Sequence, residues 1–297
     1  MTPSFVRLAP VALLVAGLFG CASKPEPPMV AVTSTSSSTA TSTVTTVAPL
    51  SRAQIDAIVA SPDRSAADRT NDQRRHPEDL LMFIGVKPGW TALDVSTGGG
   101  YTTELLARAI GPTGIVWAQS RGPSSASPKP AAPEGGAAGM PRAQRTAADM
   151  LAARSGSMKA AGVAAAPIAY VARSYDDPVP PEVANGQLDL VTLMFNYHDF
   201  GFMNVSRAQT NAAVFKALKP GGLYVIADHA GRPGTGISQS GTLHRIEESF
   251  LRAEVEAAGF KLLAEGDFLR NPSDPRNLNT PNPPQPKDEF VLKFVKP

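Results

Sequence analysis

The chain has 297 residues, with 28 basic and 26 acidic side chains, four histidines and one cysteine. A net charge of only +2, without a long run of either sign, argues against nucleic acid as a partner. Because the one cysteine, Cys21, lies near the amino terminus and outside the expected folded region, that region can hold no internal disulfide and no thiolate metal site. We expect one large domain.

The first 20 residues have the layout of an export signal. Arg7 is the only charged residue before Lys24, and it precedes an apolar stretch, residues 8–19, that is too short to span a bilayer. The segment ends in Leu-Phe-Gly-Cys, which resembles the lipobox of bacterial lipoproteins. The resemblance implies cleavage before Cys21 and a lipid anchor on that residue. Since Ala22 follows, it also implies the outer membrane, facing the periplasm. An uncleaved apolar helix with a chance cysteine is the alternative.

Residues 21–48 are expected to form a flexible tether. Residues 31–46 contain only small and polar or β-branched side chains, without charge or aromatic ring, and cannot bury enough surface to offset their ordering entropy. The folded domain is therefore expected over 49–297.

Apolar periodicity then predicts alternating helices and strands. Ser51 and Gln54 have capping-box spacing for a first helix, and a second is expected to start near His76 and to end at Gly85. A Pro/Gly/Ala/Ser-rich insertion is expected over 121–139. The expected strands are 91–95, 114–118, 168–172, 188–195, 218–228, 260–265 and 290–295, and further helices are expected over 101–107, 141–159, 213–218 and 246–257.

The strand over 91–95 runs directly into a glycine-rich turn and a helix. Residues 94–100 read Asp-Val-Ser-Thr-Gly-Gly-Gly, a spacing of Asp-x-Ser-x-Gly-x-Gly. Glycines are needed in such a turn because a ligand lying against the backbone leaves no space for a β-carbon. The pattern resembles motif I of the class I S-adenosylmethionine-dependent methyltransferases, with Ser96 in place of the first glycine.

A second segment carries the same resemblance. Residues 218–228 read Leu-Lys-Pro-Gly-Gly-Leu-Tyr-Val-Ile-Ala-Asp and resemble the LKPGG strand element of that family. Together the two motifs imply an α/β, Rossmann-like, doubly wound fold with a seven-stranded, mostly parallel sheet and an antiparallel last strand. The resemblance covers most of residues 76–297. It departs at Ser96, at Gln119, at the insertion and at a proline-rich stretch, 271–286.

The resemblance implies S-adenosylmethionine as cofactor. Gln119 stands where the family prefers an acid for the ribose hydroxyls, and Asp176 stands where it often holds the adenine amino group. The expected cofactor-binding residues are Asp94, Ser96, Gly98, Gly100, Gln119, Asp176 and Asn196. A nicotinamide-binding fold is disfavoured, because Thr103 replaces the third glycine of Gly-x-Gly-x-x-Gly and Gln119 replaces the acid.

Methyl transfer by in-line displacement needs an aligned acceptor, exclusion of water and sometimes a base. His198 and Asp199 follow the strand over 188–195 and are the expected catalytic residues, although His198 could merely bridge backbone groups. We expect no metal. The alternative is a divalent metal at Asp228 and His229, where metal-dependent O-methyltransferases have Asp-Asn.

Two functions remain open at this stage. The first is a methyltransferase that acts on a small molecule or an envelope lipid. No acceptor motif such as Asn-Pro-Pro-Tyr follows the fourth strand, so base or glutamine methylation is disfavoured. The second is a non-catalytic, ligand-binding lipoprotein that retains the fold, since the export signal conflicts with the cytosolic supply of S-adenosylmethionine.

Overall fold

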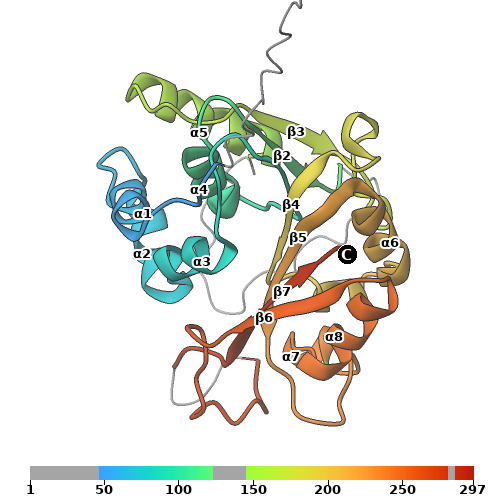
Figure 1. The fold of residues 1–297 in the computed structure, drawn as a ribbon. Coiled ribbons are helices and arrows are strands. Elements are labelled where there is room, and N and C mark those ends of the chain that lie inside the picture. Colours follow the sequence, from blue (N-terminus) through green and yellow to red (C-terminus); the bar gives the residue numbers. More distant parts are fainter. Residues whose placement is uncertain (1–46, 123–144, 280–284) are drawn as a thin grey trace, which may run out of the picture. The chain divides into compact units, whose positions relative to one another are not determined.

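A seven-stranded mixed sheet with the strand order β3-β2-β1-β4-β5-β7-β6 organises the domain (Figure 1). The computed structural model describes residues 47–122, 145–279 and 285–297. The expected export signal, nearly all of the tether and most of the insertion lie outside the described residues. The strands are β1 (Thr91–Val95), β2 (Ile115–Ser120), β3 (Ile168–Ala172), β4 (Leu188–Met194), β5 (Leu218–His229), β6 (Lys261–Gly266) and β7 (Glu289–Val295).

All neighbouring strands are parallel except β7, which runs antiparallel to both β5 and β6. The expected fold class is therefore confirmed, including the antiparallel last strand. The helices are α1 (Arg52–Val59), α2 (Ala66–Arg75), α3 (Pro77–Ile84), α4 (Tyr101–Ile110), α5 (Ala147–Ala160), η1 (Pro181–Val183), η2 (His198–Gly201), α6 (Arg207–Ala217), α7 (Ser240–Leu243) and α8 (Glu248–Ala257).

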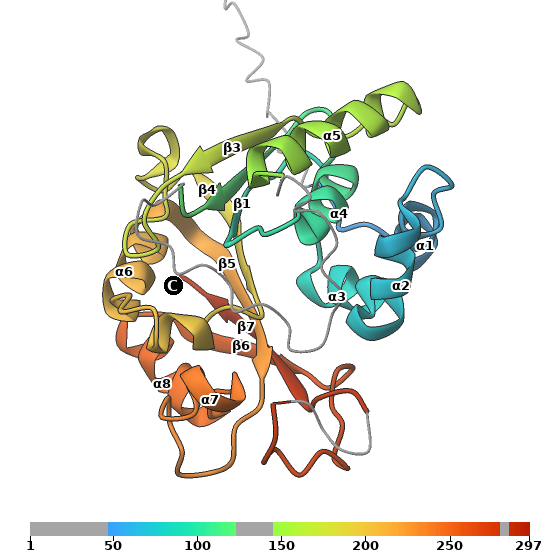
Figure 2. The same ribbon diagram turned by 180° about the vertical axis from the view of Figure 1, so that it is seen from behind.

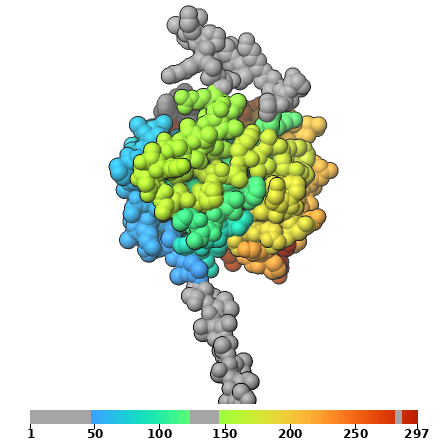
Figure 3. Space-filling model, turned by 90° about the horizontal axis from the view of Figure 1, so that it is seen from above, coloured from blue at the N-terminus to red at the C-terminus, as the bar shows by residue number. Residues whose placement is uncertain are grey.

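Alternating side chains on the strands produce three layers. In β1, Leu93 and Val95 belong to one apolar cluster, which includes residues of α6 and α8, whereas Ala92 belongs to a second cluster with residues of α1, α3, α4 and α5. Figures 1 and 2 show these two groups of helices on opposite sides of the sheet. In the space-filling view, α5 and β3, in yellow-green, lie between the blue amino-terminal helices and the yellow α6 region (Figure 3). Because period-2 strands send successive residues to opposite faces, both faces must be covered.

Helix α2 was not expected from the sequence, because its ten residues, AADRTNDQRR, have no apolar face. Ion pairs hold it in place instead. Arg154 of α5 contacts Asp68 of α2 at 2.6 Å and Glu104 of α4 at 2.5 Å, and Arg64 contacts Asp72 at 2.6 Å. These side chains are largely buried, so their mutual pairing is needed to offset desolvation. The ion pairs attach α2 beside the start of α4.

Two histidines lie between helices in the left-handed conformation. Helix α3 starts directly after His76 and has Gly85 as its C-cap, as expected, although His76 makes no side-chain cap hydrogen bond. His244 lies between α7 and α8. The capping box of Ser51 and Gln54 is confirmed at the start of α1. Among the described residues, no helix has the length and apolarity needed to cross a membrane.

Strand order also determines where a ligand can bind. Strand β1 pairs with β2 on one side and with β4 on the other. Strands β2 and β3 therefore follow on one side of β1, and the chain then crosses to β4 on the other side. In open α/β sheets the crevice outside the carboxyl ends of the strands at such a reversal is the usual ligand site. The residues that follow β1 and β4 therefore form the candidate site.

Candidate functional site

The backbone turns sharply at the carboxyl ends of both β1 and β4. Ser96, directly after β1, has φ +59°, and Phe195, directly after β4, has φ +63°. This left-handed region favours glycine, and a bulky residue there is strained. Ser96 therefore has a backbone conformation that favours glycine, the residue of the motif at this position.

A hollow of about 170 Å³ lies at this point, lined by residues from α2, β1, the turn, α4 and β4. Its lining includes the expected cofactor residues Asp94, Ser96, Gly98 and Asn196. A β-carbon on Gly98, which has φ +53°, would meet no atom within 4 Å, so this glycine presents bare backbone to open space. The turn thus has the open surface that a bound ligand requires.

Gly100 has a different role. A β-carbon there would lie 2.6 Å from Leu151 Cδ2 and 3.1 Å from Arg154 Cδ, both on α5. The residue is not among those that line the hollow. Its bare backbone allows α5 to approach the start of α4, so its glycine serves packing rather than ligand contact.

Asp94 is buried at the base of the hollow. Its Oδ2 accepts a hydrogen bond from Thr103 Oγ1 at 2.6 Å, and its Oδ1 accepts one from Thr192 Oγ1 at 2.8 Å. Burial raises the pKa of the Asp94 carboxyl, and hydrogen bonds from Thr103, Thr192 and Thr97 act in the opposite direction. These contacts join β1, α4 and β4, and they hold the carboxylate in one position.

Arg75, at the end of α2, is a site residue that sequence reasoning missed. It lines the hollow, and its Cζ lies 3.7 Å from the centroid of the Phe195 ring. Its guanidinium makes no hydrogen bond or ion pair with any other residue that the structure describes. Burial, together with the neighbouring Arg74, lowers the pKa of Arg75 to about 10, so the group remains charged at neutral pH. An unpaired, partly buried guanidinium is suited to a ligand carboxylate.

A cluster of histidines and carboxylates lies beside this hollow, after β4 and at the end of β5. His198 Nδ1 lies 2.6 Å from Asp228 Oδ1, and His198 Nε2 lies 2.9 Å from Asp199 Oδ1. His244 Nδ1 lies 3.1 Å from the same oxygen of Asp199. Asn196, which lines the hollow, donates its amide to Asp199 Oδ2 at 2.9 Å. Asn196 thus connects the hollow with the cluster.

Electrostatics in this cluster favour a charged histidine. Burial acts to lower the pKa of His198, but Asp228 and Asp199 outweigh it and raise this pKa to about 9. The pKa of Asp199 is held at about 2, because hydrogen bonds and the charge of His198 outweigh burial. With both ring nitrogens engaged, His198 has no free position from which to accept a proton. The expected base role of His198 therefore has no support in these contacts.

Three comparisons with known proteins place this geometry in context. No family model matches the sequence, and no curated protein matches it. A solved structure of a S-adenosylmethionine-dependent methyltransferase from Aquifex aeolicus is similar, with a TM-score of 0.50 at 15% identity, over 84% of this chain and 100% of that one. The fold is that of the class I methyltransferases. A TehB-like methyltransferase from Corynebacterium glutamicum has a TM-score of 0.43 at 14% identity, over 78% and 99% of the two chains.

Two of the expected cofactor-binding side chains form hydrogen bonds within the protein. The amide of Gln119, inside β2 and fully buried, accepts from Ser96 N at 3.0 Å and donates to the carbonyl of Arg173 at 2.8 Å. Asp176 accepts from Ser206 N at 2.6 Å, and from Ser174 Oγ at 2.8 Å. Neither lines the hollow. Their expected roles against ribose and adenine therefore have no support in these contacts.

Asp228 and His229 do not share a metal-ligand arrangement. Asp228 accepts three hydrogen bonds, from the backbone and ring of His198 and from the backbone of His229, all at 2.6–2.8 Å. The ring of His229 is directed elsewhere: its Nδ1 lies 2.8 Å from Glu289 Oε1 without forming a hydrogen bond. Burial lowers the pKa of His229 to about 3. The carboxylate of Asp228 therefore positions its neighbours.

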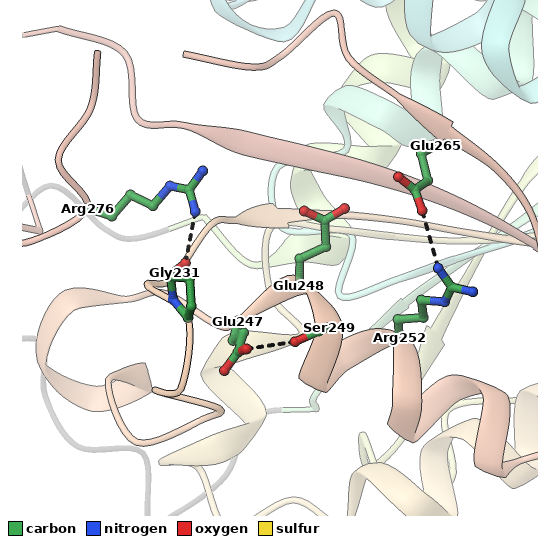
Figure 4. A pocket seen from close by; sticks show the side chains of 8 residues that line it. Gly231, Glu247, Glu248, Ser249, Arg252, Glu265 and Arg276 are labelled. Atoms are coloured by element: carbon green, nitrogen blue, oxygen red, sulfur yellow. Dashed lines mark hydrogen bonds and ion pairs between the residues drawn. The ribbon is translucent and has the colours of Figure 1, made fainter. Parts of the chain in front are cut away.

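A larger hollow of about 280 Å³ is lined by the start of α8, the end of β6 and residues that follow β5 (Figure 4). Its charged side chains are largely paired with one another or with nearby residues: Arg252 with Glu265 at 3.4 Å, Arg276 with Asp288 at 2.5 Å and Glu248 with Arg270 at 2.5 Å. Because its cations are neutralised by the protein, this hollow offers a ligand less than the one at Arg75 does.

Proposed function

We propose that the protein is a S-adenosylmethionine-dependent methyltransferase that acts on a small molecule or an envelope lipid. One observation carries the proposal. At the strand-order reversal of a methyltransferase fold, the bare backbone of Gly98 and the unpaired guanidinium of Arg75 line the same hollow. A neutral surface beside a cation matches the amino-acid end of this cofactor, which carries a carboxylate.

The residues present fit the methionine part of the cofactor. Arg75 would hold the carboxylate, and Asp94 would attract the ammonium group, since each carboxylate oxygen has a second lone pair besides the one used by a threonine. When bound, the cofactor would supply a methyl group on a positively charged sulfur. The hollow, about 170 Å³, is below the roughly 300–1,000 Å³ usual for whole small-molecule sites, which suits the methionine end of the cofactor alone.

Methyl transfer would depend mainly on positioning. Asp199 is only partly buried, with 20% of its side chain exposed. It accepts a hydrogen bond from Asn196, which lines the hollow. Its low pKa makes it a weak base, and His198 is already protonated at neutral pH. The pair is therefore proposed to orient an acceptor group, while proximity and exclusion of water supply most of the rate enhancement.

Calorimetric titration with S-adenosylmethionine tests the proposal. We expect micromolar affinity for the natural protein and at least about a tenfold weaker affinity for Arg75→Gln, because one charge-assisted contact is lost. Arg69→Gln is the matched control, since Arg69 lies on the same helix and is exposed. The absence of binding at millimolar cofactor would remove the enzymatic proposal. It would favour the non-catalytic, ligand-binding lipoprotein, with which the internal hydrogen bonds of Gln119 and Asp176 are consistent.

We also propose that the mature protein is anchored through a lipid on Cys21 to the bacterial envelope, in the outer membrane and facing the periplasm. The support is the sequence of residues 1–22 alone. Metabolic labelling with a fatty acid should mark the natural chain, whereas Cys21→Ser should remain unlabelled and leave the membrane fraction. Equal labelling of both would contradict the anchor.

A further inference from the structure

Three of the four histidines in the chain converge on one place, and the proposed methyl transfer gives a role to only one of them, His198. The ring of His198 lies 5.4 Å from that of His229 and 5.6 Å from that of His244, measured between centroids. His198 begins η2, His229 ends β5, and His244 follows α7, so distant parts of the chain supply them. Such convergence requires a physical reason.

Two of these histidines and one carboxylate have the spacing of metal ligands. One potential ligand atom each from His198, Asp199 and His244 lies within 4.8 Å of the other two. Asp199 Oδ1 lies 2.9 Å from His198 Nε2 and 3.1 Å from His244 Nδ1. Ligands about 2.0–2.2 Å from one ion, at right angles to each other, are themselves about 3 Å apart. The donors thus already have the separation that a shared ion would impose.

The residues around these donors orient them as in metal centres. Asp228, which is fully buried, engages His198 Nδ1 at 2.6 Å, and this leaves Nε2 directed at Asp199. Asn196 engages Asp199 Oδ2 and leaves Oδ1 directed at the two histidines. A carboxylate on the far nitrogen of a ligating histidine is a usual feature of such sites, because it sets the tautomer and the ring orientation.

We propose that His198, Asp199 and His244 bind one divalent first-row transition-metal ion, with further coordination positions open to water or to a substrate oxygen. Two imidazoles and one carboxylate favour zinc, iron, nickel or copper over magnesium or calcium, which prefer all-oxygen sites. Binding would require that each ligating nitrogen carry no proton. This site differs from the alternative pair Asp228 and His229, because Asp228 contacts the non-ligating nitrogen of His198.

The location gives the ion a defined role, and that role alone rests on the proposed function. Asn196 joins Asp199 to the hollow that Gly98 and Arg75 line. An ion at His198 and Asp199 would therefore lie beside the methyl donor and would bind an acceptor through oxygen. Because metal coordination lowers the pKa of a bound hydroxyl group, acceptors with a phenol, enol or similar oxygen would be the substrate class.

Metal binding is tested on the full protein after removal of metal with a chelator. Titration with Co²⁺ and with Zn²⁺ should show one equivalent bound with micromolar or tighter affinity, and bound Co²⁺ should acquire a visible absorption band. His244→Asn should weaken binding at least 100-fold, and Asp228→Asn should weaken it about 10- to 100-fold. Mg²⁺ should bind far more weakly than either ion.

His76→Asn is the matched control, because His76 and His244 are both partly exposed and both left-handed, with φ 44° and 50°. Asparagine tolerates this conformation, so both variants should fold. The control should bind metal as the natural protein does. Equal affinity of His244→Asn and His76→Asn, or no stoichiometric binding to the natural protein, would overturn the proposal. Titration with S-adenosylmethionine in the absence of metal separates this result from failure of the proposed function.

Discussion

Alanine at the two left-handed glycines of the turn should separate ligand binding from folding. A left-handed alanine costs about 1–2 kcal/mol, and the loss of chain entropy in the unfolded state returns about 0.4–1 kcal/mol. Gly98→Ala adds no clash, because its β-carbon would meet nothing within 4 Å. The free energy of unfolding should therefore fall by only about 1 kcal/mol. The same methyl group would project into the hollow and weaken S-adenosylmethionine binding at least about tenfold.

Gly100→Ala should give the opposite pattern. Its β-carbon would lie 2.6 Å from Leu151 Cδ2 and 3.1 Å from Arg154 Cδ, so overpacking of about 1–3 kcal/mol adds to the backbone strain. We expect the free energy of unfolding to fall by about 2–4 kcal/mol, with cofactor affinity changed little in the folded fraction.

Urea denaturation and calorimetric titration of both variants measure the two effects. The reasoning fails if Gly98→Ala binds the cofactor as tightly as the natural protein, since the bare backbone would then face no ligand. It fails equally if Gly100→Ala is as stable as Gly98→Ala, because the approach of α5 would then not require glycine.

Three other substitutions test buried polar groups by denaturation. Burial raises the pKa of Glu289 to about 6 from 4.5, so its contribution to stability is complete below pH 4.5 and is lost as the pH rises through 6. Relative to the natural protein, the free energy of unfolding of Glu289→Gln should therefore rise by about 2 kcal/mol between about pH 4 and pH 7. A difference that does not change with pH would contradict this. Tyr224→Phe should stabilise by about 1 kcal/mol, because the Tyr224 hydroxyl is buried without a hydrogen-bond partner among the described residues; a destabilised variant would show that the hydroxyl is satisfied. Arg245→Met should cost about 3–5 kcal/mol, because it removes the ion-pair partner of Asp274, which lies 2.9 Å from Arg245 and is 1% exposed, and leaves this buried carboxylate with backbone hydrogen bonds alone. A loss below 1 kcal/mol would mean that Asp274 finds another partner.

The three proposals are methyltransferase activity, a lipid anchor and a histidine-rich metal site. The three are tested independently, by cofactor titration, by lipid labelling and by metal titration. A protein that binds metal but not S-adenosylmethionine would be a metal-binding lipoprotein on a methyltransferase scaffold. That outcome would retain the site at His198, Asp199 and His244 and would discard the assignment of Arg75.

Local sequence determined the fold and the turn after β1. Apolar strands and the glycine spacing from Asp94 to Gly100 depend on neighbours in the chain, and they predicted the strands and the open backbone at Gly98. The resemblance to the class I methyltransferases implied the sheet plan and its antiparallel last strand. Helix α2 could not be predicted in this way. Its sequence has no apolar face, and partners as distant as Arg154 hold it.

Only the tertiary structure decided which polar side chains face a ligand. Gln119 and Asp176 stand where a local motif suggests cofactor contact, yet backbone groups of other segments occupy them. Arg75 and His244 are on elements far from the motif, and their positions depend on how α2 and the segment after α7 pack against the sheet. A side chain's partners are set by long-range packing, which spacing along one chain does not encode. The sequence alone therefore determined the scaffold, and packing determined the site.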